Sequence, residues 1–274
     1  MKEFFNCEWM VEHVQTIPWN RARIVIHGNS SRTPIGAQLR DEIVRATTTV
    51  VGDGPSEFSS LIEGSEAILL SGGIAEVIRS EDLIDSRIPM RIVKHPETHT
   101  INWGVKLLPG TAEGLLLCDL GNIFLRTAFA GTILKFPRNF SNLPHLSVDC
   151  SAREQRQAYA NLQRFLRAKI CAALPKDIGC ISGIIFGVSG GGGTAEQAPS
   201  LSYLGHGSYY TAISEVLSAL RLSDKLKQIV NSEVMAVWSS SLANDIGGLR
   251  KCTILQLGSH IAGVRVAWHG TSSR

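Results

Sequence analysis

The amino-acid sequence predicts an α/β fold, because two kinds of segment alternate along most of its 274 residues. Short apolar runs rich in β-branched residues indicate buried strands, and apolar residues at helical spacing between them indicate amphipathic helices. Two patterns of strand, turn and strand, at 115–131 and 252–270, begin about 140 residues apart. Each opens with an apolar run and turns on small polar residues, which is typical of a tight turn between paired strands.

Composition limits the class of protein. With 44% hydrophobic and 19% charged residues, the chain is long enough for one large or two modest domains with buried cores. The net charge of +3 is small and the basic residues are dispersed, so nucleic acid is not an expected partner. The six cysteines form no Cys-x-x-Cys pair, which indicates neither a zinc site nor a disulfide framework. No run approaches the roughly 20 apolar residues of a membrane span, and acidic residues interrupt the N-terminal apolar stretch, so a cytoplasmic location is expected.

The first 80 residues are predicted to alternate between strand and helix after an opening helix. The predicted elements are a helix over 2–15, a strand over 22–28 that ends in a glycine turn, a helix over 34–46, a strand over 48–52, a helix near 57–66 and an apolar stretch over 67–78. Residues 81–113 are richer in charge, proline and histidine. They are interpreted as a connector with two short extended pieces, PMRIVKH and NWGVKLLPG.

The alternation restarts at residue 114. The predicted elements are a hairpin over 115–131, a third strand over 133–136, a helix to about residue 173, a strand over 183–189, a helix with apolar residues at 213, 216, 217 and 220, a strand that turns into a helix over 226–242, and the two strands of 252–270. Ser151 and Glu154 form a capping-box pattern, which fixes the start of the first helix. We expect 114–250 to form one α/β domain, and the strands of 252–270 to pair with 22–70 in a second.

The turn DLGN at 119–122 has two interpretations. Gly-Asn accepts the positive φ of a tight turn, which favours a purely structural hairpin. The backbone N–H groups of such a turn can also bind a phosphate, but sites of this kind usually need a second turn. The segment 252–270 supplies a second turn at Gly258, Ser259 and His260.

This pair of turns resembles the actin, sugar-kinase and heat-shock ATPase superfamily, in which two lobes each supply one turn to the phosphates of a nucleotide. Several segments resemble the hexokinase family in particular. VKLLPG with LLLCDLGNIFLRTAF is similar to the first phosphate turn, Asp-Leu-Gly-Gly-Thr-Asn-Phe-Arg. TILQLGSHIAG is similar to the second phosphate turn, Gly-Thr-Gly-Ser-Asn-Ala. The other similar segments are LPHLSVDCSAREQRQAYANLQRFL, GIIFGVSG and LKQIVNSEVMAVWSSSL.

The first 80 residues resemble the other end of a hexokinase. RIVIHGNSSRTPIGAQLRDEIV and GDGPSEFSSLIEGSEAILL are similar to the segments that close over the adenosine near the hexokinase C-terminus. The resemblance therefore implies actin-like ATPase (ribonuclease H-like) lobes in a permuted or partial hexokinase fold. It assigns 1–80 to the adenosine side of the large lobe, 114–250 to the small lobe with the first phosphate turn, and 251–274 to the second phosphate hairpin.

The resemblance also implies ATP and Mg²⁺ as cofactors and a glucose-like hexose as substrate. Asp119 would hold the metal through water, and Ser232 occupies the position of the catalytic aspartate, with Glu233 beside it. The residues assigned to ATP, in addition to Asp119, are Gly121, Asn122, Arg126, Gly258, Ser259, Gly28, Asn29, Ser30, Gly54 and Ser56. The residues assigned to the sugar are Ser189 and Asn231.

Five positions bear on whether the chain can catalyse phosphoryl transfer. Asn122 and Ile123 stand where the family has Gly and Thr, and His260 replaces a glycine of the second turn. Ser232 offers a hydroxyl where phosphoryl transfer needs a carboxylate to take the sugar proton. On a strand end, Glu233 would point the opposite way from Ser232, and it could replace that carboxylate only if the local backbone formed a turn.

Three functions remain open. The first is ATP-dependent phosphorylation of a hexose, weakened or lost. The second is a non-catalytic relative that regulates by binding a nucleotide, a sugar or a protein partner. The third is a heat-shock-type ATPase lobe, because IVIHGNSSRTPIGAQL also resembles the adenosine turn of those chaperones. The missing peptide-binding β-domain counts against the third function.

Overall fold

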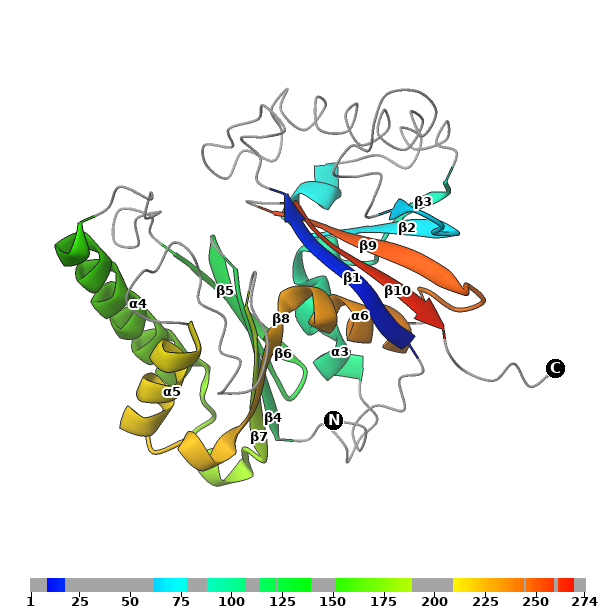
Figure 1. Cartoon of the computed structure of the whole chain (residues 1–274). Coiled ribbons are helices and arrows are strands. Elements are labelled where there is room, and N and C mark those ends of the chain that lie inside the picture. Colours follow the sequence, from blue (N-terminus) through cyan, green and yellow to red (C-terminus); the bar gives the residue numbers. More distant parts are fainter. Residues whose placement is uncertain are drawn as a thin grey trace. The chain divides into compact units, whose positions relative to one another are not determined.

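The structure is a computed structural model with a mixed α/β fold, which confirms the predicted fold class. It describes residues 9–17, 62–77, 88–106, 114–121, 123–138, 151–188, 209–243, 245–258 and 261–268. The chain divides into two compact units (Figure 1). Unit 1 comprises Met1–Trp103 and Ala236–Arg274, and unit 2 comprises Gly104–Met235. Each unit contains a five-stranded sheet.

The sheet of unit 2 has the strand order β6-β5-β4-β7-β8. Its strands are β4 (Leu115–Leu120), β5 (Phe124–Phe129), β6 (Thr132–Pro137), β7 (Gly183–Val188) and β8 (Leu226–Asn231). Strand β5 is antiparallel to β4 and β6, whereas β4, β7 and β8 are parallel to one another. The predicted hairpin, third strand and two later strands are therefore confirmed.

Helices α4 (Ala152–Ala173) and α5 (Tyr209–Ala219) cover one face of this sheet (Figure 1). The capping box predicted at Ser151 and Glu154 is present and begins α4. Every residue of β4 and β7 is buried, and the alternate side chains at 116, 118 and 120 and at 184, 186 and 188 pack with the apolar faces of both helices in one core. Short 3₁₀ turns at Ile178–Cys180 and Ser223–Lys225 precede β7 and β8.

The sheet of unit 1 has the order β1-β10-β9-β2-β3 and combines strands from both ends of the chain. Its strands are β1 (Trp9–Ile17), β2 (Ala67–Ser71), β3 (Met90–Ile92), β9 (Lys251–Leu257) and β10 (Ile261–Trp268). The two strands predicted in 252–270 are confirmed as the β9-β10 pair, whereas Ser259 and His260 of the turn between them lie outside the described residues. The parallel pairing of β2 with β9 brings an early and a late segment together. The strand predicted at 22–28, which was expected in the same sheet, lies outside the described residues.

The helical elements of unit 1 are η1 (Gly73–Val77), η3 (Pro96–Thr98) and α3 (His99–Lys106). Helix α6 (Ser232–Leu242) begins in unit 2 and continues into unit 1, because the boundary between the units falls after Met235. Ala236 and Val237 of α6 pack against β9 and β10 in the unit 1 core. The predicted change from strand to helix in 226–242 is thus confirmed.

The two sheets share one topology. In unit 1, β10 is antiparallel to β9 and β1, while β9, β2 and β3 are parallel. Strands β9, β10, β1, β2 and β3 therefore occupy the places of β4, β5, β6, β7 and β8 in unit 2. Trp9 at the start of β1 lies opposite Trp268 at the end of β10. If the chain ran from β10 directly into β1, the five strands of each sheet would follow one another along the chain in the same order.

Two predicted elements are wrong. Residues 9–17, expected in a helix over 2–15, form strand β1, because pairing with β10 supplies backbone partners that the local helical spacing does not anticipate. Residues 102–106, expected to be extended in NWGVKLLPG, belong to helix α3. The other piece of the expected connector, PMRIVKH, forms β3 and pairs with β2. The predicted elements over 22–28, 34–46 and 48–52 lie outside the described residues.

Candidate functional site

The candidate site lies in unit 2, at the carboxyl ends of its parallel strands. Asp119 is the penultimate residue of β4, and Asn231 is the last residue of β8. The chain runs from β4 outward through β5 and β6, then crosses to β7 on the other side of β4. In open α/β sheets the carboxyl ends beside such a switch in direction are the usual place for ligands.

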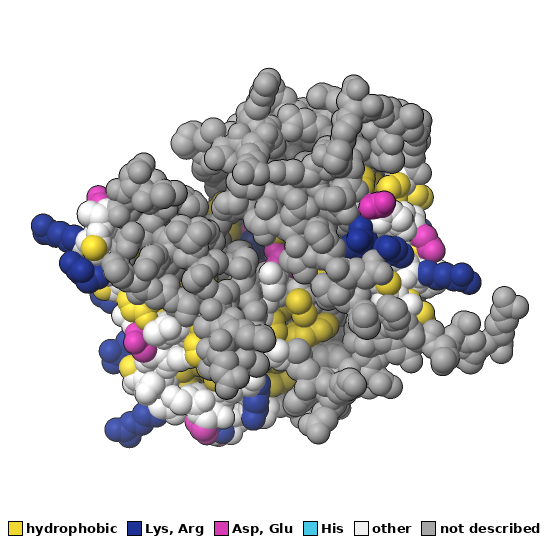
Figure 2. All heavy atoms as spheres, viewed as in Figure 1, with side chains coloured by type: hydrophobic (Ala, Val, Ile, Leu, Met, Phe, Trp, Pro, Cys, Tyr) yellow, Lys and Arg dark blue, Asp and Glu magenta, His cyan; other side chains and the backbone are white. Residues whose placement is uncertain are grey.

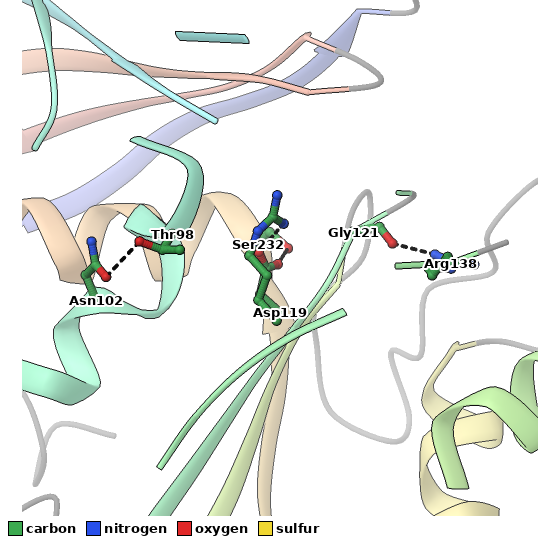
Figure 3. Close-up of polar contacts among 7 residues, drawn as sticks. Thr98, Asn102, Asp119, Gly121, Arg138 and Ser232 are labelled. Atoms are coloured by element: carbon green, nitrogen blue, oxygen red, sulfur yellow. Dashed lines mark hydrogen bonds and ion pairs between the residues drawn. The ribbon is translucent and has the colours of Figure 1, made fainter. Parts of the chain in front are cut away.

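A buried hydrogen bond joins β4 to the start of α6. The Ser232 hydroxyl donates to Asp119 Oδ1 at 2.9 Å, and the two residues point toward each other in Figure 3. Their exposed fractions are only 2% and 4%. Arg126 stands opposite Asp119 in the β4-β5 register, and its Nη1 lies 3.4 Å from Asp119 Oδ2. The Asp119 carboxylate thus faces a hydroxyl on one side and a guanidinium on the other.

Asn231 positions the start of α6. Its side-chain Oδ1 accepts a hydrogen bond from the Glu233 backbone N–H at 2.8 Å, which is the bond an N-cap residue makes. Ser232 and Glu233 therefore occupy the first turn of a helix, whose partial positive charge favours the Asp119 carboxylate nearby. The expectation that Glu233 continues a strand and points away from Ser232 is wrong, because the helix begins one residue earlier.

Glu233 is a buried acid beside this hydrogen bond. It is 1% exposed, and no residue of the described chain gives its Oε2 a hydrogen bond. The pKa of Glu233 is raised to about 7, mainly by burial and in addition by the negative charge of Asp119, although a hydrogen bond to its own backbone N–H opposes the change. Near neutral pH the site therefore holds one carboxyl that is partly protonated.

Gly187 of β7 makes room for the start of α6. A Cβ at this position would lie 2.2 Å from Met235 Sδ and 3.3 Å from Ser232 Oγ. Only glycine allows the helix to approach the strand this closely. The Ser232 hydroxyl therefore reaches Asp119 because β7 carries no side chain at that point.

The turn after β4 is held by backbone and side-chain bonds. The Gly121 N–H donates to Phe124 O at 3.0 Å. Arg138 Nη1 donates to Gly121 O at 2.5 Å from the end of β6 (Figure 3). Arg126 and Arg138 thus place two guanidinium groups next to the turn that the sequence assigned to phosphate.

The structure brings several of the predicted site residues together and places another in the second unit. Asp119 contacts both Arg126 and Ser232, and Asn231 and Glu233 are the residues on either side of Ser232. Gly258 directly follows β9 in unit 1. The predicted residues that lie outside the described part are Asn122, Ser259, Gly28, Asn29, Ser30, Gly54, Ser56 and Ser189.

Two residues of the site were missed by the sequence. Gly187 interrupts the buried run GIIFGV, and a glycine inside a strand signals a close backbone or helix approach. The close approach at Gly187 could therefore have been predicted from the sequence. Arg138 lies beyond β6 at the end of a segment without a motif, so only the return of β6 beside β5 places it at the turn.

Outside the contact of Asp119 with Ser232, the described residues show four further features. They contain no group of three or more His, Cys, Asp and Glu side chains that could hold a metal ion. Cys118 and Cys252 are buried free thiols, and burial raises the pKa of each. Lys and Arg side chains lie at separate places on the face shown in Figure 2 rather than in one patch. None of the described helices is long and apolar enough to span a membrane.

Comparisons with known proteins give no assignment. No family model, curated protein or solved structure matches this chain. The site in unit 2, the topology of the two sheets and the motifs in the sequence are therefore the features that bear on function.

Proposed function

We propose that this chain is a nucleotide-binding protein with actin-like ATPase lobes, related to hexokinases, in which phosphorylation of a hexose is weakened or lost. The observation that carries the proposal is the contact of Asp119 with Ser232 at the carboxyl edge of the unit 2 sheet. In the hexokinase motifs these positions belong to the first phosphate turn and to the catalytic aspartate. Two segments that resemble separate parts of one active site therefore share a hydrogen bond.

The topology supports the proposed lobes. Each unit has three strands joined by antiparallel pairing and two further parallel strands, which is the arrangement expected of an actin-like ATPase lobe. The equivalent strands β4 and β9 are each followed directly by a glycine, Gly121 and Gly258 respectively. Both predicted phosphate turns therefore follow the same strand of their own sheet.

The residues of the site fit a hydrated magnesium ion. Asp119 and Glu233 supply only oxygen atoms, which are the ligands that Mg²⁺ prefers, and Glu233 Oε2 is a buried acceptor without a hydrogen bond from the described residues. Asp119 would hold the ion through its waters, and Arg126 would face the phosphates from β5. A bound Mg²⁺ would supply positive charge for the phosphate oxygens.

Ser232 is the reason to expect weak phosphorylation of sugar. A serine hydroxyl does not take a proton from a sugar hydroxyl at neutral pH, and general-base assistance is worth about 10² to 10⁴ in rate. Asp119 already receives the Ser232 hydrogen bond and faces Arg126. The binding of nucleotide is therefore better supported than the transfer of phosphate to glucose.

A nucleotide titration tests the proposal. We expect saturable binding of ATP to the purified chain that strengthens when Mg²⁺ is added. Arg126→Ala should weaken this binding by about tenfold or more, because a charged contact to phosphate is lost. Arg167→Ala is the matched control, since Arg167 is exposed on α4, and it should leave the affinity unchanged. Absence of any ATP binding would contradict the proposal.

A second test addresses the sugar reaction. We expect the wild-type chain to phosphorylate glucose far below the roughly 1 to 100 per second that is usual for kinases. Ser232→Asp restores a carboxylate at the position of the base and should raise the rate. The measurement is coupled detection of ADP with and without glucose. An ordinary kinase rate in the wild-type chain would point to Glu233 as the working base and overturn the expected loss.

A further inference from the structure

We infer that Ser232 is itself a phosphoryl acceptor, which takes the γ-phosphate of a nucleoside triphosphate bound by the same chain. This inference rests on the proposed nucleotide binding and assigns the site a reaction that the hexokinase motifs do not imply. The geometry is the hydrogen bond from the Ser232 hydroxyl to Asp119 Oδ1 at 2.9 Å. A nucleophilic hydroxyl held against a carboxylate is the arrangement that activates serine for transfer.

The transfer balances without any further reactant. Ser232 Oγ forms a bond to the γ-phosphorus, and the bond from that phosphorus to the bridging oxygen of the nucleotide breaks. The hydroxyl proton passes along the existing hydrogen bond to Asp119, and a nucleoside diphosphate leaves with the bonding electron pair. The products are phosphoserine at 232 and the diphosphate.

Burial favours Ser232 over water as the acceptor. The hydroxyl and its carboxylate partner are 2% and 4% exposed, so solvent is largely excluded from the reacting oxygen. A hydroxyl fixed within hydrogen-bonding distance of its base also needs no ordering from solution, which raises its effective concentration. Exclusion of water from an active site suppresses competing hydrolysis.

The surroundings of Ser232 accommodate a phosphate group. Ser232 is the first residue of α6, and the N-terminus of a helix stabilises a phosphoserine through its free N–H groups and its dipole. Arg126 lies next to the Asp119 carboxylate and offers a guanidinium for charge-assisted hydrogen bonds. Asp119 and Glu233 oppose the added negative charge, so the modified serine should favour the side of Arg126.

The test is incubation of the full chain with Mg²⁺ and ATP labelled on the γ-phosphate, followed by peptide mass spectrometry. We expect the label on Ser232, with a first-order rate that does not change over a tenfold range of protein concentration. Ser232→Ala should lose more than about 100-fold of the label, and Ser232→Thr should carry it as phosphothreonine. Ser239→Ala removes a second buried hydroxyl of α6 and should be labelled like the wild type.

Asp119→Asn separates the role of the carboxylate from that of the fold. The rate of labelling should fall by about 10² to 10⁴, because the base is lost. ATP affinity and circular dichroism, measured on the same sample, show whether the variant still binds and folds. Label that persists in Ser232→Ala, or a rate proportional to protein concentration, would overturn the inference. Wild-type protein that binds ATP but stays unlabelled would overturn it while leaving the proposed function intact.

Discussion

Two neighbouring side chains at the start of α6 differ in what they contribute to the site. Ser232 is satisfied by Asp119, whereas the Glu233 Oε2 atom has no hydrogen-bond partner in the described chain. A buried carboxyl with one oxygen that accepts no hydrogen bond is stable mainly in its neutral form, because burial penalises the charge. The protonation of Glu233 and the close packing around Ser232 should therefore both affect stability.

The pKa of Glu233 predicts a pH-dependent stability. Because burial raises the pKa from 4.5 to about 7 in the folded state, the neutral carboxyl favours folding fully below pH 4.5. That contribution, on the order of 3 kcal/mol, is lost as the pH rises from 4.5 through about 7. In urea unfolding between pH 4 and 8, the free energy of unfolding should fall with this slope against pH in the wild type and not in Glu233→Gln.

Asp224→Asn is the matched control for this measurement, because Asp224 is an exposed acid of the same unit. It should keep the wild-type slope. Equal slopes in the wild type, Asp224→Asn and Glu233→Gln would show that Glu233 does not titrate in this range.

The approach of α6 to β7 predicts a coupled pair of substitutions. Gly187→Ala places a Cβ 2.2 Å from Met235 Sδ, so the side chain or the helix must move, at a cost of about 1 to 3 kcal/mol. Met235→Ala alone opens a cavity and should also destabilise unit 2. In the double variant the new methyl group fills part of that cavity. Denaturant unfolding should therefore give a loss smaller than the sum of the two single losses, and strict additivity would contradict the packing described.

At the scale of elements, local sequence and tertiary pairing agree in unit 2. The apolar strands β4 and β7 are buried on both faces, and α4 begins at its capping box. In the loop between β5 and β6, by contrast, one residue does not suit its backbone conformation. Ala130 and Gly131 both have positive φ, at 45° and 80°, as a two-residue type I′ turn requires. Alanine is a poor residue for that conformation.

The β5-β6 turn predicts a stabilising substitution. Ala130 is exposed, so Ala130→Asn changes no core contact while it supplies a residue that tolerates the left-handed region. We expect the free energy of unfolding to rise by about 0.5 to 1 kcal/mol, measured by thermal or urea unfolding. Gly131→Ala is the opposite control and should lower stability, because its φ of 80° strains any side chain. A loss of stability in Ala130→Asn would contradict the turn geometry.

At the scale of the whole molecule, the strand order links the two ends of the chain. Strands β9 and β10 occupy the places of β4 and β5, and β1 completes the antiparallel part of the unit 1 sheet. Trp9 and Trp268 lie opposite each other, so β10 ends where β1 starts. The chain order of unit 1 thus differs from that of unit 2 by a single change of connection.

A circular permutant tests this relation. Joining residue 274 directly to residue 1 leaves residues 269–274 and 1–8 to connect β10 to β1, which is ample for neighbouring strand ends. New ends placed within 107–113 would make both sheets continuous in the same strand order. We expect this permutant to fold with the wild-type circular dichroism and a cooperative unfolding transition. A second permutant opened inside α4, between residues 162 and 163, should fail, because it breaks a helix of the core. An unfolded first permutant would refute the proposed connection.

Sequence patterns determined the elements whose local signals agree with their tertiary setting. The capping box at Ser151 and the apolar strands carry their own physical reasons, since caps and burial depend on nearby residues. The positive φ expected in the turn after β4 is absent at Gly121, and Asn122 lies outside the described residues. The contact of Asp119 with Ser232 joins two positions that the resemblance to hexokinase motifs had singled out.

The tertiary structure alone decided what depends on distant partners. Residues 9–17 carry apolar residues at helical spacing, yet β10 offers them backbone hydrogen bonds, and they form a strand. The first helical residue is Ser232, so Glu233 lies in a buried turn of α6 instead of continuing a strand. Arg138 reaches the Gly121 carbonyl only because β6 folds back beside β5. Each of these outcomes follows from a pairing or a packing contact between segments remote in the chain, which local periodicity does not encode.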